Sequence, residues 1–154
     1  MYTCGVPELL QVYDPDNPAY RIRADASLII LATNESPDVL VRAVGLEPDE
    51  KWAKGDPLKR GGKRPYTGIR YASRLDEKQS PSDHVVALVD RLRPHVEGIA
   101  AVSRQEATYG VTLWVVEHTH ADDRQIDIQP EALEAIAAME TRLSVDLYFY
   151  DEDD

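Results

Sequence analysis

The stretch ASLIILAT, residues 26–33, decides the fold of this chain. Its eight residues are apolar on both faces, which suits a β-strand covered on one or both sides and is too short for a membrane span. Further strand signals, rich in β-branched and aromatic residues, follow at residues 68–73 (GIRYAS), 109–118 (YGVTLWVVEH) and 143–150 (LSVDLYFY). A β-sheet is therefore expected at the centre of the protein.

Helical patterns lie between these strands. A helix is predicted from Ser36, whose hydroxyl can cap free backbone donors, to Gly45, a residue type suited to helix ends. A longer helix begins at Ser80, and its apolar residues recur at intervals of three and four. Pro94 interrupts that pattern, so we expect a kink or a break there. A last helix begins at Pro130.

The sequence also predicts which side chains of the last helix and of the last strand share a face. The residues expected on the inner side of the helix are Leu133, Ile136, Ala137 and Met139. Alternation in the strand divides its residues between two faces, with Val145, Leu147 and Phe149 on one and Ser144, Asp146, Tyr148 and Tyr150 on the other.

The order of elements is strand–helix–strand, a long helix, then strand–helix–strand. This order predicts one α+β domain with a mainly antiparallel sheet and helices on one face. The two strand–helix–strand units resemble a loose duplication. We assign residues 26–150 to the domain, residues 1–25 to a turn-rich N-terminal arm and residues 151–154 to an acidic tail.

The composition is that of an acidic protein with one domain. The 154 residues include 28 acidic and 17 basic side chains, a formal net charge of −11 at pH 7, which argues against general nucleic-acid binding. No apolar run approaches the roughly 20 residues of a membrane helix, and the N-terminus lacks the order of a signal peptide. The single cysteine, Cys4, rules out an internal disulfide and suits a reducing cytoplasm. We therefore expect a cytoplasmic protein that does not enter a membrane.

The basic charge is concentrated in one segment, residues 51–74, which contains eight basic residues and a single acidic one. Two interpretations stay open. The segment is a docking surface or an anion contact, whose glycines allow close backbone approach, or it folds onto the acidic body and partly neutralises it. It lacks the residue order of a nucleotide-binding P-loop. Its candidate binding residues are Lys51, Trp52, Lys54, Gly55, Asp56, Lys59, Arg60 and Tyr66.

Two hypotheses concern how this segment is held. Trp52, which is flanked by lysines, is either a recognition anchor or an apolar pin that fastens the segment to the core. Asp146 shares a strand face with Tyr148, and we hypothesise that it forms a hydrogen bond with a basic side chain of the segment. The alternative is a polar strand face turned to solvent. Asp146 and Tyr148 complete the candidate binding residues.

Signals for catalysis are weak. His118 and His120 would face one side of a strand, as metal ligands can, but a zinc site needs three protein ligands. A polar strand end explains this segment more simply. Cys4 has no local histidine partner, and no G-x-S-x-G elbow occurs. We therefore expect no catalytic residue, no metal and no cofactor.

Three short motifs resemble one bacterial family. They are Gly45-Leu46-Glu47-Pro48, Trp52-Ala53-Lys54-Gly55-Asp56-Pro57 and Asp146-Leu147-Tyr148. Together with the helices and strands between them, residues 26–150 resemble the family catalogued as domain of unknown function 4279. The resemblance implies one compact α+β domain and leaves the function open. Some small bacterial domains of this kind lie beside toxins and act as immunity proteins.

The leading expectation for function is a non-enzymatic, cytoplasmic bacterial protein that binds another macromolecule, a protein partner above all. Toxin neutralisation is its most concrete form. An acidic body complements a basic partner and speeds encounter by electrostatic steering. The alternative is a protein, an enzyme included, that binds a small molecule or a small anion with the basic segment, Trp52 and Tyr66.

Overall fold

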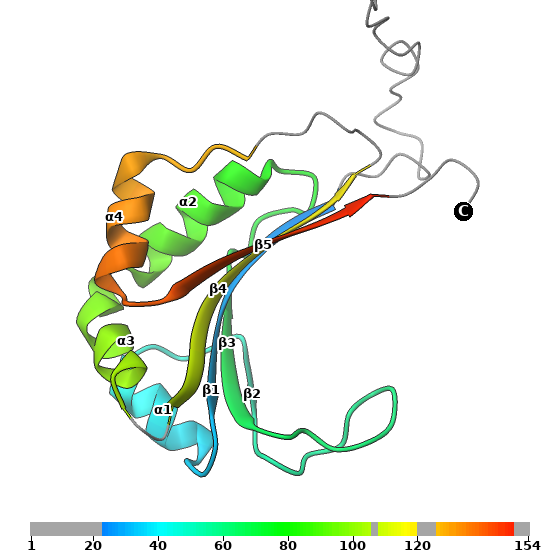
Figure 1. Cartoon of the computed structure of the whole chain (residues 1–154), viewed down its shortest axis with the longest axis vertical. Helices are drawn as coiled ribbons and strands as arrows, with labels where there is room; N and C mark the ends of the chain where they lie inside the picture. The colour runs from blue at the N-terminus through cyan, green and yellow to red at the C-terminus, as the bar shows by residue number, and fades with distance from the viewer. Residues whose placement is uncertain (1–22, 106–107, 120–125, 150–154) are drawn as a thin grey trace, which may run out of the picture.

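A five-stranded mixed β-sheet organises the described residues of the computed structural model, which are 23–105, 108–119 and 126–149 (Figure 1). The elements in chain order are β1 (Arg23–Ala32), α1 (Pro37–Val44), β2 (Glu50–Trp52), β3 (Thr67–Ala72), α2 (Pro81–Leu92), η3 (Arg93–His95), α3 (Val96–Ser103), β4 (Thr108–Thr119), α4 (Pro130–Ala138) and β5 (Arg142–Phe149). The strand order is β2-β3-β1-β4-β5. Neighbouring strands are antiparallel except β4 and β5, which are parallel.

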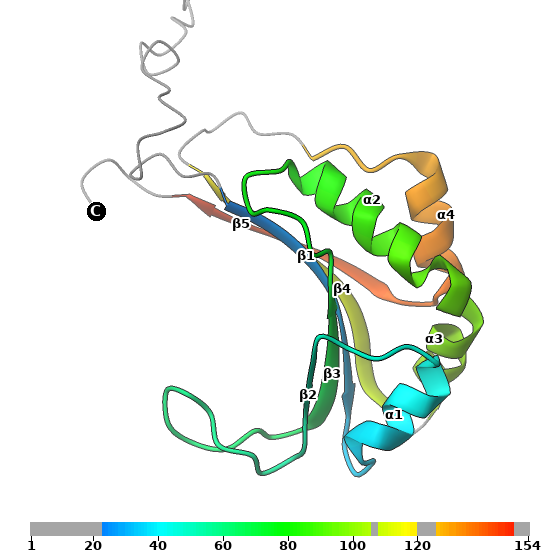
Figure 2. The same cartoon turned by 180° about the vertical axis from the view of Figure 1, so that it is seen from behind.

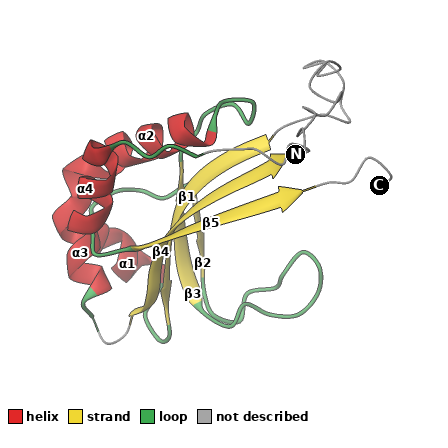
Figure 3. Ribbon diagram, turned by 45° about the horizontal axis from the view of Figure 1, so that its top comes forward, coloured by secondary structure: helices red, strands yellow, loops and turns green. Residues whose placement is uncertain are grey.

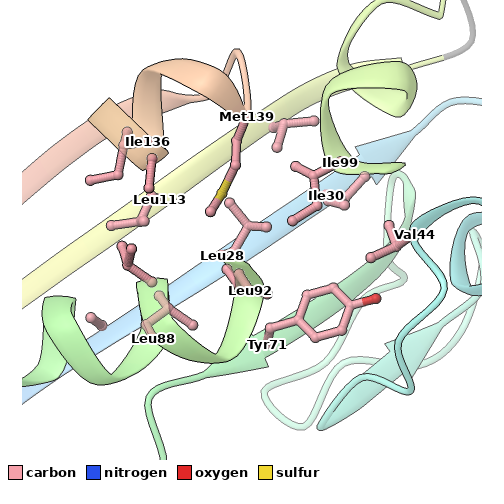
Figure 4. Packing of buried hydrophobic residues seen from close by; sticks show 14 of the residues in the cluster. Leu28, Ile30, Val44, Tyr71, Leu88, Leu92, Ile99, Leu113, Ile136 and Met139 are labelled. Atoms are coloured by element: carbon pink, nitrogen blue, oxygen red, sulfur yellow. The ribbon is translucent and has the colours of Figure 1, made fainter. Parts of the chain in front are cut away.

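The described helices lie against one face of this sheet (Figures 1 and 2). β1 forms the centre of the core, because its even-numbered residues from Ala24 to Ala32 point toward the helices and are almost fully buried. Leu88 and Leu92 of α2 and Ile99 of α3 pack in the same cluster (Figure 4). The predicted single α+β domain, with helices on one face of a mainly antiparallel sheet, is confirmed.

The helix ends follow the predicted signals with one difference. Gly45 ends α1 in the left-handed conformation, with a φ of 77°, and its N–H donates to the Val41 carbonyl at 2.8 Å. The Ser80 hydroxyl caps α2 by accepting a hydrogen bond from the Asp83 N–H at 3.1 Å. The expected cap at Ser36 is wrong in detail. Its side chain forms no capping bond, and its carbonyl oxygen accepts hydrogen bonds from the N–H groups of Val39 and Leu40 instead.

The long helical pattern breaks at Pro94, as predicted. α2 ends at Leu92, a short 3-10 turn contains the proline, and α3 begins at Val96. Proline has no N–H to donate to the preceding turn, so a regular helix cannot pass through it. The break lets α2 lie over β1 while α3 packs against α1. This second contact is close, because a Cβ at Gly98 would lie 2.7 Å from the Ala43 carbonyl oxygen.

α4 turns a different face inward from the predicted one. Its buried stripe consists of Ala132, Ala135 and Ile136, and Met139, directly after the helix, continues it. The prediction was wrong for Leu133, which is 44% exposed, and for Ala137, which is exposed as well. The observed stripe has the regular three-and-four spacing of one helix face, and its two alanines suit a close approach to α2 and α3.

The two strand–helix–strand units do not share one topology. β1 and β3 pair antiparallel, whereas β4 and β5 are parallel neighbours, so the chain must return through α4 to the end where β4 began. β1 begins at Arg23 rather than at Ala26. The rest of the predicted N-terminal arm and the acidic tail lie outside the described residues. Among the described helices, none has both the length and the apolar composition needed to cross a membrane.

Candidate functional site

The ends of the basic segment 51–74 are neutralised by the acidic body. Three of its cations, all close to the sheet, form ion pairs: Lys51 with Asp38 (3.1 Å) and Glu47 (3.4 Å), Arg70 with Asp25 (2.6 Å) and Glu50 (2.9 Å), and Arg74 with Asp49 (2.7 Å). The hydrogen bond to Asp38, together with the charges of Asp38 and Glu47, raises the pKa of Lys51. For these three cations, the structure supports the interpretation that the segment folds onto the acidic body.

Residues 53–66 form a hairpin that joins β2 to β3 and projects from the rest of the molecule (Figures 1 and 3). Its two sides are joined by backbone hydrogen bonds from Gly55 N–H to the Arg64 carbonyl (2.9 Å) and from Arg64 N–H to the Asp56 carbonyl (2.8 Å). Gly61 and Gly62, at its tip, have φ angles of 89° and 88°, which glycine adopts without strain. We call residues 53–66 the basic hairpin.

Trp52 fastens the base of the basic hairpin to the sheet. Its indole N–H donates to the Tyr66 carbonyl at 3.1 Å, which joins the two ends of the hairpin. The ring packs against Gly68 of β3, which has no side chain, and a Cβ at that position would come within 2.2 Å of the ring. The Arg64 guanidinium lies 4.2 Å from the ring centroid, a cation–π contact. These contacts support the interpretation of Trp52 as a pin.

Five cations belong to the basic hairpin: Lys54, Lys59, Arg60, Lys63 and Arg64. All except Arg64 are exposed. In the part of the chain that the structure describes, none of the five has a carboxylate oxygen within 4.0 Å. The one acid of the hairpin, Asp56, is used internally and accepts a hydrogen bond from the Ala53 N–H at 2.8 Å. The hairpin thus presents uncompensated positive charge on a protein that is acidic as a whole.

An aromatic pair lies beside the base of the hairpin. The rings of Tyr66 and Tyr109 stack with their centroids 4.2 Å apart and an angle of 20° between their planes. Tyr109 belongs to β4 and is 57% exposed. Sequence reasoning selected Tyr66 and missed Tyr109, because the partners are 43 residues apart and Tyr109 is part of a strand signal. The pair extends the candidate surface from the hairpin onto the end of the sheet.

The hypothesis that Asp146 bonds to the basic segment is wrong. β5 lies at one edge of the sheet and β2 at the other, and β1 and β4 separate β5 from β3. Asp146 is in register with Val116 of β4. Tyr148 stacks on His118, with ring centroids 4.9 Å apart. Asp146 and Tyr148 are therefore not brought together with the basic hairpin.

The described residues do not support a metal centre. His120 lies outside them, and the His118 ring is stacked on Tyr148. Within residues 23–105, 108–119 and 126–149, no group of three or more metal-binding side chains comes together. We expected no metal because a zinc site needs three protein ligands, and this expectation stays a prediction.

Asp49 is a polar centre that sequence reasoning missed. Its carboxylate accepts hydrogen bonds from Arg91 (2.5 Å), Arg74 (2.7 Å) and the Ala72 N–H (2.8 Å), which joins the segment before β2 to β3 and α2. Burial raises the pKa of Asp49, but these hydrogen bonds outweigh that effect and lower it from 3.8 to about 2. The partners lie 23 to 42 residues away in sequence, so no local pattern reveals them.

Comparison with known proteins identifies one family. Residues 19–150 match the family described as domain of unknown function (DUF4279). No curated protein and no solved structure matches the chain. The match covers the whole described fold and includes the basic hairpin, Trp52 and the segment that holds Asp49. The chain therefore belongs to the family of domain of unknown function 4279.

Proposed function

We propose that this protein is a non-enzymatic, cytoplasmic bacterial protein that binds another protein, and that the basic hairpin is its contact. One observation carries the proposal: four exposed cations project from a fastened hairpin, and within the described residues no carboxylate neutralises them. The surface complementary to the hairpin is an acidic patch on the partner, which differs from the basic partner that the net charge of the chain by itself led us to expect. Neutralisation of a toxin that displays such a patch is the most concrete form of this role.

The fastening of the hairpin favours binding by charge. The backbone ladder from Gly55 to Arg64 and the Trp52 pin hold the cations in one region before a partner arrives. A preordered contact loses less conformational entropy on binding than a free loop of the same composition. Exposed like charges in one place also steer an oppositely charged partner during diffusion, so association should slow with added salt.

A small anion is the weaker candidate for this surface. Backbone cradles for phosphate need N–H groups that are free to bind the ligand. In the hairpin, the Gly55 N–H already donates to the Arg64 carbonyl and the Gly61 N–H donates to the Leu58 carbonyl. Two of the three glycine N–H groups of the hairpin are therefore used within it, and among the described residues of the hairpin only that of Gly62 is left to contribute to a cradle. The remaining attraction for an anion comes from exposed lysine and arginine side chains, which favour a broad acidic surface.

The test compares two charge-reversal variants of the tagged protein in affinity purification from its native cytoplasm. One variant carries Lys54→Glu, Lys59→Glu and Lys63→Glu in the hairpin. The matched control carries Arg42→Glu, Lys78→Glu and Arg93→Glu, three exposed positions outside it. Both variants change the net charge equally, so a difference between them reports the position of the charge.

We expect wild type and control to retain one stoichiometric protein partner that the hairpin variant loses. Retention by the hairpin variant would place the contact elsewhere. Release of the bound material by nuclease would make the partner a nucleic acid and overturn the proposal. A rise in melting temperature with inorganic phosphate, lost in the hairpin variant, would favour the anion-binding alternative.

A further inference from the structure

β5 forms an open edge of the sheet, at the side opposite β2 (Figure 3). Within the described residues, its outer side is paired with no strand. Its register with β4 runs without a bulge from Arg142 to Phe149, and the strand contains no proline. Natural edge strands are commonly protected from pairing by bulges, by prolines or by charges. β5 therefore keeps a regular outer row of backbone N–H and C=O groups.

The apolar side of β5 is not covered by the helices. In register with β4, this side faces the same way as the buried residues Leu113 and Val115, which belong to the core. Its residues are nevertheless 37–54% exposed: Leu143, Val145, Leu147 and Phe149. Four exposed apolar side chains in one row form a patch rather than isolated surface residues. The apolar face of the sheet thus continues from the core to β5, where no described residue covers it.

We infer that β5 pairs with β5 of a second copy of this chain, antiparallel and about a two-fold axis at Ser144. In this register Arg142 of each copy lies opposite the partner's Asp146, so two oppositely charged pairs form. Leu143 lies opposite the partner's Val145, which joins the two apolar rows. A two-fold contact uses the same patch on both copies and closes without forming a fibre.

Charge complementarity selects this register. Shifting the axis to Asp146 would place the two Asp146 carboxylates opposite each other, and like charges directly opposite are destabilising. Placing the axis between two residues would put an apolar row opposite a polar one, because side chains alternate along a strand. Arg142 and Asp146 both lie on the face away from the helices, where in-register neighbours are Thr112 and Val116.

The pairing goes beyond the proposed function and does not depend on it. β2 and the basic hairpin lie at the far edge of each sheet from β5. The dimer would therefore contain one continuous ten-stranded sheet with a basic hairpin at each end. Two equivalent contacts on one particle would strengthen binding to a partner that offers two acidic patches.

The test measures the mass of the full chain in solution by sedimentation velocity, from low to high micromolar concentration. The wild type is expected to sediment as a dimer at the upper end of this range. Arg142→Asp places two carboxylates opposite each other at two points and should weaken the dimer about tenfold. The double variant Arg142→Asp with Asp146→Arg restores opposite charges and should return the dissociation constant to nearly that of the wild type.

Arg42→Asp, an equal charge change on an exposed residue of α1, is the control and should leave the dimer unchanged. Circular dichroism confirms that each variant is folded. A wild type that stays monomeric throughout the concentration range would overturn the inference. A dimer that survives Arg142→Asp, or one that the double variant fails to restore, would also overturn it. None of these results depends on the hairpin variants.

Discussion

Asp49→Asn removes one negative charge from the point where α2, β3 and the segment before β2 meet. The substitution keeps the shape of the side chain and leaves the guanidinium groups of Arg91 and Arg74 without their shared counter-ion. The side chains of Arg91 and Asp49 are only 16% and 20% exposed, so water cannot fully replace the lost contacts. We expect the variant to fold with a lower free energy of unfolding.

The magnitude follows from the pKa of the carboxyl group. It falls from 3.8 in the ordinary state to about 2 in the folded protein. Since one pKa unit corresponds to about 1.4 kcal/mol, the native contacts of the ionised group contribute about 2 kcal/mol near pH 7. The folded pKa is the lower one, so this contribution is complete above about pH 4 and is lost as the pH falls toward 2. Near pH 3, about 1 kcal/mol of it should remain.

The assay is urea unfolding of wild type and Asp49→Asn near pH 7 and near pH 3, followed by circular dichroism. Asp90→Asn is the matched control, because Asp90 pairs with Arg93 at 3.4 Å on the surface of α2, where both side chains are more than half exposed. The control should lose less than about 0.5 kcal/mol. A loss at Asp49 no larger than in the control, or one that is the same at both pH values, would refute the reasoning.

Three further substitutions test the packing. Gly98→Ala would push a methyl group against the backbone of α1 and should lower the free energy of unfolding by about 1–3 kcal/mol in urea; an unchanged midpoint would contradict the close helix contact. Tyr71→Phe removes the hydroxyl that donates to the Leu46 carbonyl at 2.8 Å and should cost about 1 kcal/mol by the same measurement, whereas no loss would mean that this bond adds nothing. Gly68→Ala should displace the Trp52 ring and speed trypsin cleavage within the basic hairpin, and unaltered cleavage would argue against the pin.

Much of the fold could be predicted because its signals are local. The apolar run at 26–33 became β1, and the proline after Ser80 marked the start of α2. Pro94 broke the long helical pattern for a covalent reason, the missing N–H, which no tertiary contact can restore. α4 was predicted less well, since the choice between the Leu133 stripe and the Ala132 stripe depends on what packs against the helix.

The candidate site was predicted in composition but not in arrangement. The concentration of cations at 51–74 and the two roles open to Trp52 were visible in the sequence. Which cations stay uncompensated was not, because Lys51, Arg70 and Arg74 find their carboxylates across the fold. The predicted hydrogen bond of Asp146 was wrong for the same reason. The order of the strands in the sheet sets the distance between β5 and the basic segment, and the sequence does not reveal that order.

By itself, the sequence determined four of the five strands, the helix starts and the break at Pro94, whereas β2 and the hairpin that follows it were not predicted. Each of the predicted features rests on backbone geometry or on periodicity within a few residues. The tertiary structure alone decided that β5 is the edge strand of the described sheet with an exposed apolar row, that Asp49 joins three elements, and that Trp52 rests on Gly68. These contacts join residues far apart in the chain, and they exist only because the sheet brings the strands together in the order β2-β3-β1-β4-β5.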